Sequence, residues 1–198
     1  MLYTGLVAHL KRRLLRHWTI IILTLLTFWA CSSGQKQTTE EKPKAMSIDE
    51  MLKIEDPTSA IIELDERVNE LSDYGEDISK LTEPQKVLLF VENLEREVNN
   101  GGFNQFYFNS SGDYAHETLD GLKTIGANKM VDILMKANSV WPNQTVPKDR
   151  TERQNIQETI EEQADPVWEQ CDNDFYEYPD DIAGLLLEYV KKHKADFE

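Results

Sequence analysis

The stretch TEPQKVLLFVENLEREVNNGGFNQFYFN, residues 82–109, decides the fold of this chain. Its first half carries apolar residues every three or four positions, which is the spacing of an amphipathic helix. Thr82 precedes this run and a glutamine follows three residues later, the capping-box pattern of a helix start. Leu89 and Phe90 widen the apolar stripe, so the sequence predicts a central and largely buried helix.

Two glycines in the middle of the stretch predict where that helix ends. Gly101 and Gly102 are consecutive, and glycine tolerates the left-handed backbone conformation in which many helices end. The residues that follow, FNQFYF at 103–108, form the only candidate strand in the sequence, and it is short.

Helical patterns account for most of the remaining sequence. Apolar periodicity, caps and proline or glycine breaks predict further helices at about 47–54, 56–71, 114–125, 128–138, 150–164 and 181–194. The 150–164 segment has only Ile156, Ile160 and Ala164 in its stripe, so we expect it on the outside. The sequence therefore predicts an all-α fold, a single compact bundle of about six or seven helices.

Residues 1–30 differ in charge from the rest of the chain. They contain four lysine or arginine residues and no acid, whereas the whole chain has a net charge of −15. The basic start leads into an apolar run, TIIILTLLTFWA at 19–30, which is shorter than the ~20 residues that span a bilayer. A basic segment, a short apolar core and a small residue before Cys31 resemble the signal peptide of a bacterial lipoprotein.

This pattern predicts the domain organisation and the location of the protein. Residues 1–30 are the predicted signal peptide, Cys31 the lipid-accepting residue, 31–46 the lipidated end with its flexible tether, and 47–198 the folded domain. The domain would then lie in the bacterial cell envelope, anchored to a membrane through a lipid and outside the cytoplasm. Two alternatives stay open: an uncleaved signal anchor with an incidental cysteine, and translation from Met46, which would give a cytosolic protein.

Patterns that carry catalytic or metal chemistry are weak in this sequence. HETLD at 116–120 lacks the second histidine of a helical zinc site, and DNDFYEYPDD at 172–181 lacks the glycine and final glutamate of a calcium loop. NNGGF follows a helix rather than a strand, without the lysine that would bind phosphate. Cys171 is surrounded by acids, which disfavour a reactive thiolate and favour a small, partly buried residue. We therefore predict no metal, no cofactor and no catalytic residue.

The strongest compositional signal is an acidic stretch near the C-terminus. From 152 to 181 it holds eleven acids against Arg153 alone. If it were wholly helical, its carboxylates would be spaced about 4 Å along the axis, close to the ~3.4 Å per phosphate of one DNA strand. Such a surface attracts basic proteins and repels nucleic acid, although a merely solubilising surface is the alternative. The predicted acidic face consists of Glu152, Glu158, Glu161, Glu162, Asp165, Glu169, Asp172, Asp174, Glu177, Asp180 and Asp181.

A longer motif connects this chain to a known family. EREVNNGGFNQFYFNSSGDYAHETLDGLKTIGANKMVDIL, residues 95–134, resembles the domain of the bacterial DNA-mimic proteins called DMP-nineteen-like, and residues 175–190 resemble its end. The resemblance implies an all-α domain over roughly 83–190 with a strongly acidic surface; in the named member of the family, that surface imitates duplex DNA and sequesters a DNA-binding regulator. The matching motif positions are Asn99, Asn100, Gly101, Gly102, Phe103, Gln105, Phe106, Asn109 and Gly112.

The chemistry of the motif allows two interpretations. Amide side chains offer both donors and acceptors, so Asn99, Asn100, Gln105 and Asn109 can satisfy backbone groups where the helix stops. The aromatic residues can fix that turn in the core. Alternatively, amides and rings line a pocket for a small ligand or substrate. The structural interpretation is our first hypothesis.

Together these observations predict a membrane-anchored, non-catalytic acidic domain that binds a basic protein. The alternatives are a small-ligand binder or enzyme that uses the motif, and a cytosolic DNA mimic that starts at Met46. No direct nucleic-acid binding is expected, because the surface repels phosphates. The sequence leaves open whether the domain forms a homodimer.

Overall fold

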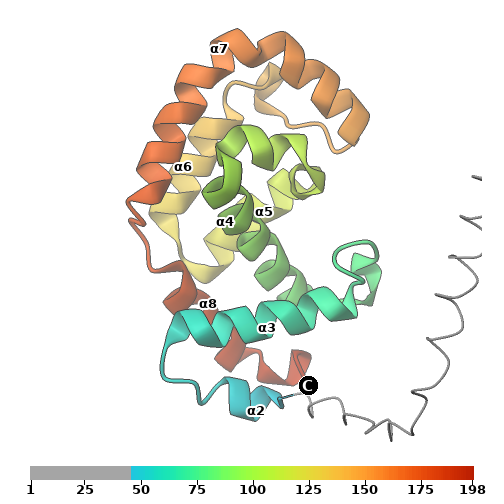
Figure 1. Cartoon of the computed structure of the whole chain (residues 1–198), viewed down its shortest axis with the longest axis vertical. Helices are drawn as coiled ribbons and strands as arrows, with labels where there is room; N and C mark the ends of the chain where they lie inside the picture. The colour runs from blue at the N-terminus through green and yellow to red at the C-terminus, as the bar shows by residue number, and fades with distance from the viewer. Residues whose placement is uncertain (1–45) are drawn as a thin grey trace, which may run out of the picture. The chain divides into compact units, whose positions relative to one another are not determined.

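The computed structural model describes residues 46–198, and this part of the chain is built from helices (Figure 1). It contains seven α-helices and no strand, which confirms the predicted all-α fold. Residues Ala45–Glu198 form one compact unit. The α-helices are α2 (Ile48–Met51), α3 (Pro57–Leu71), α4 (Glu83–Phe108), α5 (Ala115–Ile125), α6 (Asn128–Asn138), α7 (Arg150–Tyr176) and α8 (Ile182–Lys192). Short 3-10 helices lie between them: η1 (Ile78–Lys80), η2 (Ser110–Tyr114), η3 (Pro142–Gln144) and η4 (Lys194–Asp196).

Helix α4 runs through the middle of this unit and contacts α3, α5, α7 and η2 (Figure 1). Leu88, Val91 and Leu94 are at most 1% exposed, so its first half is buried as predicted. The helix begins with the predicted capping box. The Thr82 hydroxyl accepts from the Gln85 backbone N–H at 3.3 Å, and the Gln85 side chain accepts from the Thr82 N–H at 2.9 Å.

The backbone of α4 breaks at the two glycines and then becomes helical again. Gly102 has φ 72° and ψ −174°, a conformation that is essentially restricted to glycine. The predicted end is therefore correct for the first segment of α4, but the candidate strand at 103–108 is wrong, because these residues form a second helical segment. Phe103, Phe106 and Tyr107 lie at helical spacing and are all fully buried, which a strand would not allow.

Helix α7 is longer and more buried than the sequence pattern indicated. It continues past 164 to Tyr176, and it curves across α4 and α6 (Figure 1). Pro166 lies inside it on the exposed side, where the carbonyl that loses its partner can bind water. The predicted bounds of 150–164 were too short, and the helix is less exposed than expected, because its buried stripe runs along almost the whole of α7. That stripe consists of Arg153, Gln157, Ile160, Ala164, Trp168, Cys171 and Phe175.

Aromatic rings fill the space between α4, α7 and the segment after α6. The Tyr107 ring centroid lies 5.3 Å from that of Trp141 and 5.2 Å from that of Trp168. The Tyr107 hydroxyl donates to Asn138 Oδ1 at 2.7 Å, and Trp168 Nε1 donates to the Ala137 backbone oxygen at 3.1 Å. Since these bonds satisfy buried polar atoms, they fix the second segment of α4 against α6 and α7.

Cys171 lies on the buried stripe of α7 and has no exposed surface. Burial raises the pKa of its thiol to about 11. The thiol is therefore protonated at neutral pH and acts as a small apolar residue in the core.

The predicted signal peptide, Cys31 and the tether up to residue 45 lie outside the described residues. Within residues 46–198, no helix combines the length and the apolarity that crossing a bilayer requires.

We expect Gly102→Ala to lower the free energy of unfolding by about 1–3 kcal/mol, because its φ of 72° is unfavourable for any residue with a Cβ. The new methyl group would also press against the Asp172 carboxylate. Gly101→Ala is the control for the backbone conformation: its φ of −161° is ordinary extended backbone, although its Cβ would displace the Gln105 side chain and so weaken the Gln105–Glu97 hydrogen bond. Thermal unfolding of the full-length chain in mild detergent, followed by circular dichroism, measures both. Equal losses would mean that the break does not depend on the conformation of Gly102.

Candidate functional site

Glu97, on the first segment of α4, joins the polar side chains of the motif. Its Oε2 accepts from Gln105 Nε2 at 2.7 Å and from Asn109 Nδ2 at 2.8 Å. Its Oε1 accepts from Ser111 Oγ at 3.1 Å. Hydrogen bonds to a charged acceptor are stronger than neutral ones, so this carboxylate ties the two segments of α4 to η2.

Asn99 and Asn100 lie on the exposed side of the break in α4. Asn99 Nδ2 donates to the Tyr178 hydroxyl at 2.5 Å, and that hydroxyl donates to Glu95 Oε1 at 3.1 Å. These bonds attach the segment after α7 to α4. Gln105 and Asn109 thus share Glu97, whereas Asn99 bonds Tyr178, so the motif amides do not line one common cavity. This favours their structural interpretation.

Arg153 is fully buried although it is charged. Its guanidinium donates to four backbone oxygens and one carboxylate at 2.5–3.2 Å. The number of acceptors matches the five N–H donors of a guanidinium, so the buried charge is fully hydrogen bonded. The acceptors are the backbone oxygens of Tyr107, Asn109, Pro147 and Lys148 and Oδ1 of Asp113.

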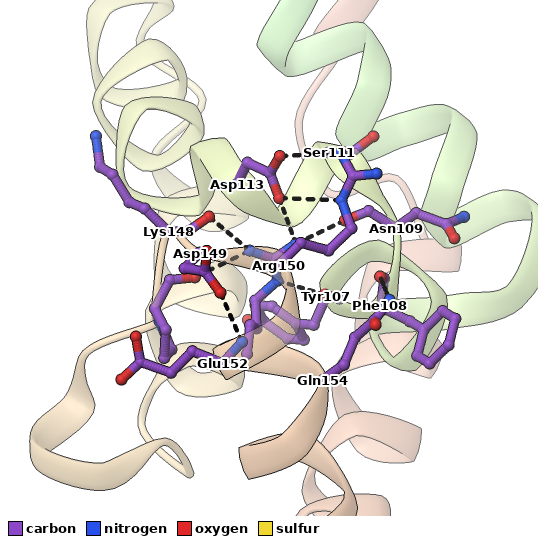
Figure 2. Close-up of polar contacts among 12 residues, drawn as sticks. Tyr107, Phe108, Asn109, Ser111, Asp113, Lys148, Asp149, Arg150, Glu152 and Gln154 are labelled. Carbon is purple, nitrogen blue, oxygen red and sulfur yellow. Dashed lines mark hydrogen bonds and ion pairs between the residues drawn. The ribbon is translucent and has the colours of Figure 1, made fainter.

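Gly112 of the motif is explained by the approach of Arg153. A Cβ at this position would lie 2.8 Å from Arg153 Nε and 2.8 Å from the Tyr107 backbone oxygen. Such contacts are too short for a real side chain, so only glycine lets α7 come this close to η2. On the solvent side, Arg150 pairs with Asp113 at 3.0 Å (Figure 2).

Four acids of the predicted acidic face have structural partners. Asp172 accepts from the backbone N–H of the residue after the α4 break at 2.7 Å, and Asp174 pairs with a lysine of α6 at 3.3 Å. Asp180 accepts from two backbone N–H groups at the start of α6 at 2.7 and 3.0 Å, while Asp181 caps α8 at 3.0 Å. These four carboxylates therefore have roles within the fold that the prediction of an acidic face did not include.

The other seven acids lie along the exposed side of α7 and just beyond its end. None of the salt bridges found within residues 46–198 involves them. At ~1.5 Å per residue they follow one another about every 6 Å along the helix, a wider spacing than the 4 Å expected from all eleven. We call this set the acidic ridge: Glu152, Glu158, Glu161, Glu162, Asp165, Glu169 and Glu177.

Glu92 on α4 has a pKa in the range that a general acid requires. Its pKa is raised to about 8, mainly by burial and further by the carboxylates of Glu95 and Asp65, while Arg96 lowers it. A carboxyl that is protonated at neutral pH can act in catalysis, but buried ion networks shift pKa values in the same way. Asp65 and Arg96 form such a pair at 2.5 Å. Within residues 46–198, no group of three or more His, Cys, Asp or Glu side chains is arranged to hold a metal ion.

Two cavities lie close to the motif without using its matched residues. One, of about 320 Å³, lies between the second segment of α4 and the first half of α7. The other, of about 200 Å³, lies between the end of α3, α4 and η2. Neither wall contains any of the nine matched motif positions, so a ligand in either cavity would contact different residues. The wall of the larger cavity consists of Asn104, Phe108, Gln154, Asn155, Gln157, Glu158 and Glu161.

Sequence reasoning missed the roles of Arg153 and Gln157, because an apolar pattern counts both as surface residues. The signal was present in their spacing. Extending the stripe of Ile160 and Ala164 toward the N-terminus in steps of three and four residues reaches first Gln157 and then Arg153. A charged residue at a stripe position predicts a buried residue with polar partners.

The fold and the surface define an all-α domain in which a broken central helix supports an acidic outer helix. A family model described as DMP19-like protein matches residues 79–193. Since this match covers more than half of the chain, the protein belongs to the DMP19-like family, as the motif resemblance predicted. No curated protein and no solved structure matches the chain.

We expect Arg153→Met to lower the free energy of unfolding by about 3–5 kcal/mol, because Asp113 loses its buried partner and four backbone oxygens lose the hydrogen bonds that the guanidinium donates. Arg150→Met is the matched control, since it removes an exposed partner of the same carboxylate and should cost less than about 1 kcal/mol. Thermal unfolding of the two variants beside the parent chain makes the comparison. A loss at Arg153 no larger than the loss at Arg150 would contradict the central role of the buried guanidinium.

Proposed function

We propose that this protein is a non-catalytic, lipid-anchored protein of the bacterial cell envelope whose acidic ridge binds a basic surface on a protein partner. The observation that supports this function is the ridge itself, which presents seven exposed carboxylates on the outer side of one helix. The basic residues at the start of α7 do not neutralise it, because Arg150 and Arg153 both pair with Asp113. A line of unpaired charges raises the local concentration of oppositely charged partners and steers their approach.

The spacing of the ridge carboxylates determines how closely this surface can imitate the charge of DNA. One strand of DNA carries a phosphate every ~3.4 Å along the duplex axis, whereas the ridge carries a carboxylate about every 6 Å. The ridge thus resembles the charge of DNA at lower density. Binding should accordingly weaken more gently with salt than binding of the same partner to a duplex.

The partner proposal is tested with a lysine-rich helical peptide as the basic probe and the full-length chain in mild detergent. The combined variant Glu162→Gln, Asp165→Asn and Glu169→Gln removes three ridge charges. At roughly 0.5 kcal/mol per charge, the affinity at low salt should fall about tenfold, and added salt should reduce the difference. Isothermal titration calorimetry at two salt concentrations measures both effects.

The matched control removes the same number of charges from exposed positions elsewhere, with Glu55→Gln, Glu63→Gln and Glu70→Gln around α3. Both variants have the same net charge, so a general effect of charge would weaken the peptide equally. An equal loss, or an affinity that does not change with salt, would rule out the ridge as the binding surface.

The anchor proposal is tested by metabolic labelling with palmitate in a bacterial host. We expect the label on the parent chain and on Cys171→Ala, but not on Cys31→Ala, because Cys31 follows the predicted signal peptide and Cys171 is buried. Label that persists in Cys31→Ala would overturn the anchor. Absence of label from every chain, together with a product that starts at Met46, would instead support the cytosolic DNA-mimic alternative that the family resemblance suggests.

A further inference from the structure

We propose that the 320 Å³ cavity between the second segment of α4 and the first half of α7 binds a guanidinium group, presented by an arginine side chain of the protein partner. This inference rests on the proposed function and adds a specific receptor to the ridge. The cavity and the ridge share Glu158 and Glu161, so one partner can contact both.

The wall of the cavity contains acceptors but no basic residue. Four amide side chains and two carboxylates surround it, and Phe108 supplies the aromatic ring. Phe108 is 52% exposed, unlike the buried rings of Phe106 and Tyr107 next to it. In Figure 2 its ring points away from the polar cluster around Asp113, and Gln154 Nε2 donates to its backbone oxygen at 2.8 Å. An exposed ring beside carboxylates is an arrangement that attracts cations.

Gln157 provides an acceptor that lacks a partner. The residue is 5% exposed and belongs to the cavity wall, and its Oε1 has no hydrogen-bond partner within the described part of the chain. Its orientation is fixed by the other end of the amide, because Nε2 donates to the backbone oxygen of Asn104 at 2.9 Å and to Asn104 Oδ1 at 3.1 Å. A buried acceptor without a donor is unfavourable. The Oε1 atom is itself enclosed, so a ligand N–H group would satisfy it once the Gln157 side chain turns toward the cavity.

The chemistry of the wall selects the class of ligand. An anion is disfavoured by Glu158 and Glu161, and a purely apolar ligand would leave the amides unpaired. Among cations, a guanidinium is planar, stacks on an aromatic ring and directs several N–H donors at once, whereas an ammonium is a compact and strongly hydrated charge. The cavity holds about ten water molecules at ~30 Å³ each, which suits a side chain rather than a large cofactor.

The test compares an arginine-rich peptide with a lysine-rich peptide of the same length and charge, using the full-length chain in mild detergent. We expect the arginine peptide to bind more tightly. Phe108→Leu, which keeps an apolar side chain but removes the ring, should weaken the arginine peptide about two- to fivefold and leave the lysine peptide unchanged. The ridge variant Glu162→Gln, Asp165→Asn and Glu169→Gln should weaken both peptides alike. Capped single arginine, titrated alone, reports the cavity without the ridge.

These outcomes separate the receptor from the ridge. If both peptides bind the parent chain equally, or if Phe108→Leu weakens them equally, the guanidinium site is overturned while the acidic ridge stands. If neither peptide binds but capped arginine binds in a Phe108-dependent manner, the cavity is a guanidinium site and the ridge proposal fails. If no probe binds, both proposals fail.

Discussion

Arg153 places a positive charge where the core would otherwise require an apolar side chain. Moving a guanidinium out of water costs several kcal/mol unless all its donors are satisfied. The four backbone oxygens and the Asp113 carboxylate that satisfy it come from the end of α4, from η2 and from the segment before α7. These three parts of the chain must therefore reach their final positions together. The glycine at position 112 is one consequence, since a side chain there would keep Arg153 away from its acceptors.

The charges of this protein divide into two groups with different physical roles. Asp113, Asp172 and Glu97 are used inside the fold, where they accept hydrogen bonds from buried or partly buried donors. The acidic ridge is not used in this way, and its carboxylates remain in water. Exposed charges keep their hydration and are screened by salt, so the ridge contributes little to the free energy of folding. Its charges are available for long-range attraction of a partner. Composition alone does not separate the two groups, since both consist of the same residue types.

Periodicity was sufficient to predict the all-α fold, the capping box at Thr82 and most helix bounds, because these depend on neighbours in the sequence. The second segment of α4 was harder to predict, because its aromatic residues favour a strand by composition, whereas the fold buries Phe103, Phe106 and Tyr107 on one face of a helix. The partners of Asp172 and Asp180 lie fifty or more residues away along the chain. The local sequence pattern therefore could not separate these two acids from the exposed ones. The guanidinium cavity depends on two elements that only the folded chain brings together, so no spacing in the sequence indicates it.

The curvature of α7 has a geometrical consequence for recognition. The helix curves over α4 and α6 with its convex side outward (Figure 1). Because the ridge residues are exposed, we infer that they follow the outside of this arc in gradually diverging directions. A rigid, flat partner could touch only a few of them at a time. A concave surface, or an unfolded basic segment that bends as it binds, could follow the whole arc. The shape of α7 thus discriminates among partners that carry the same charge.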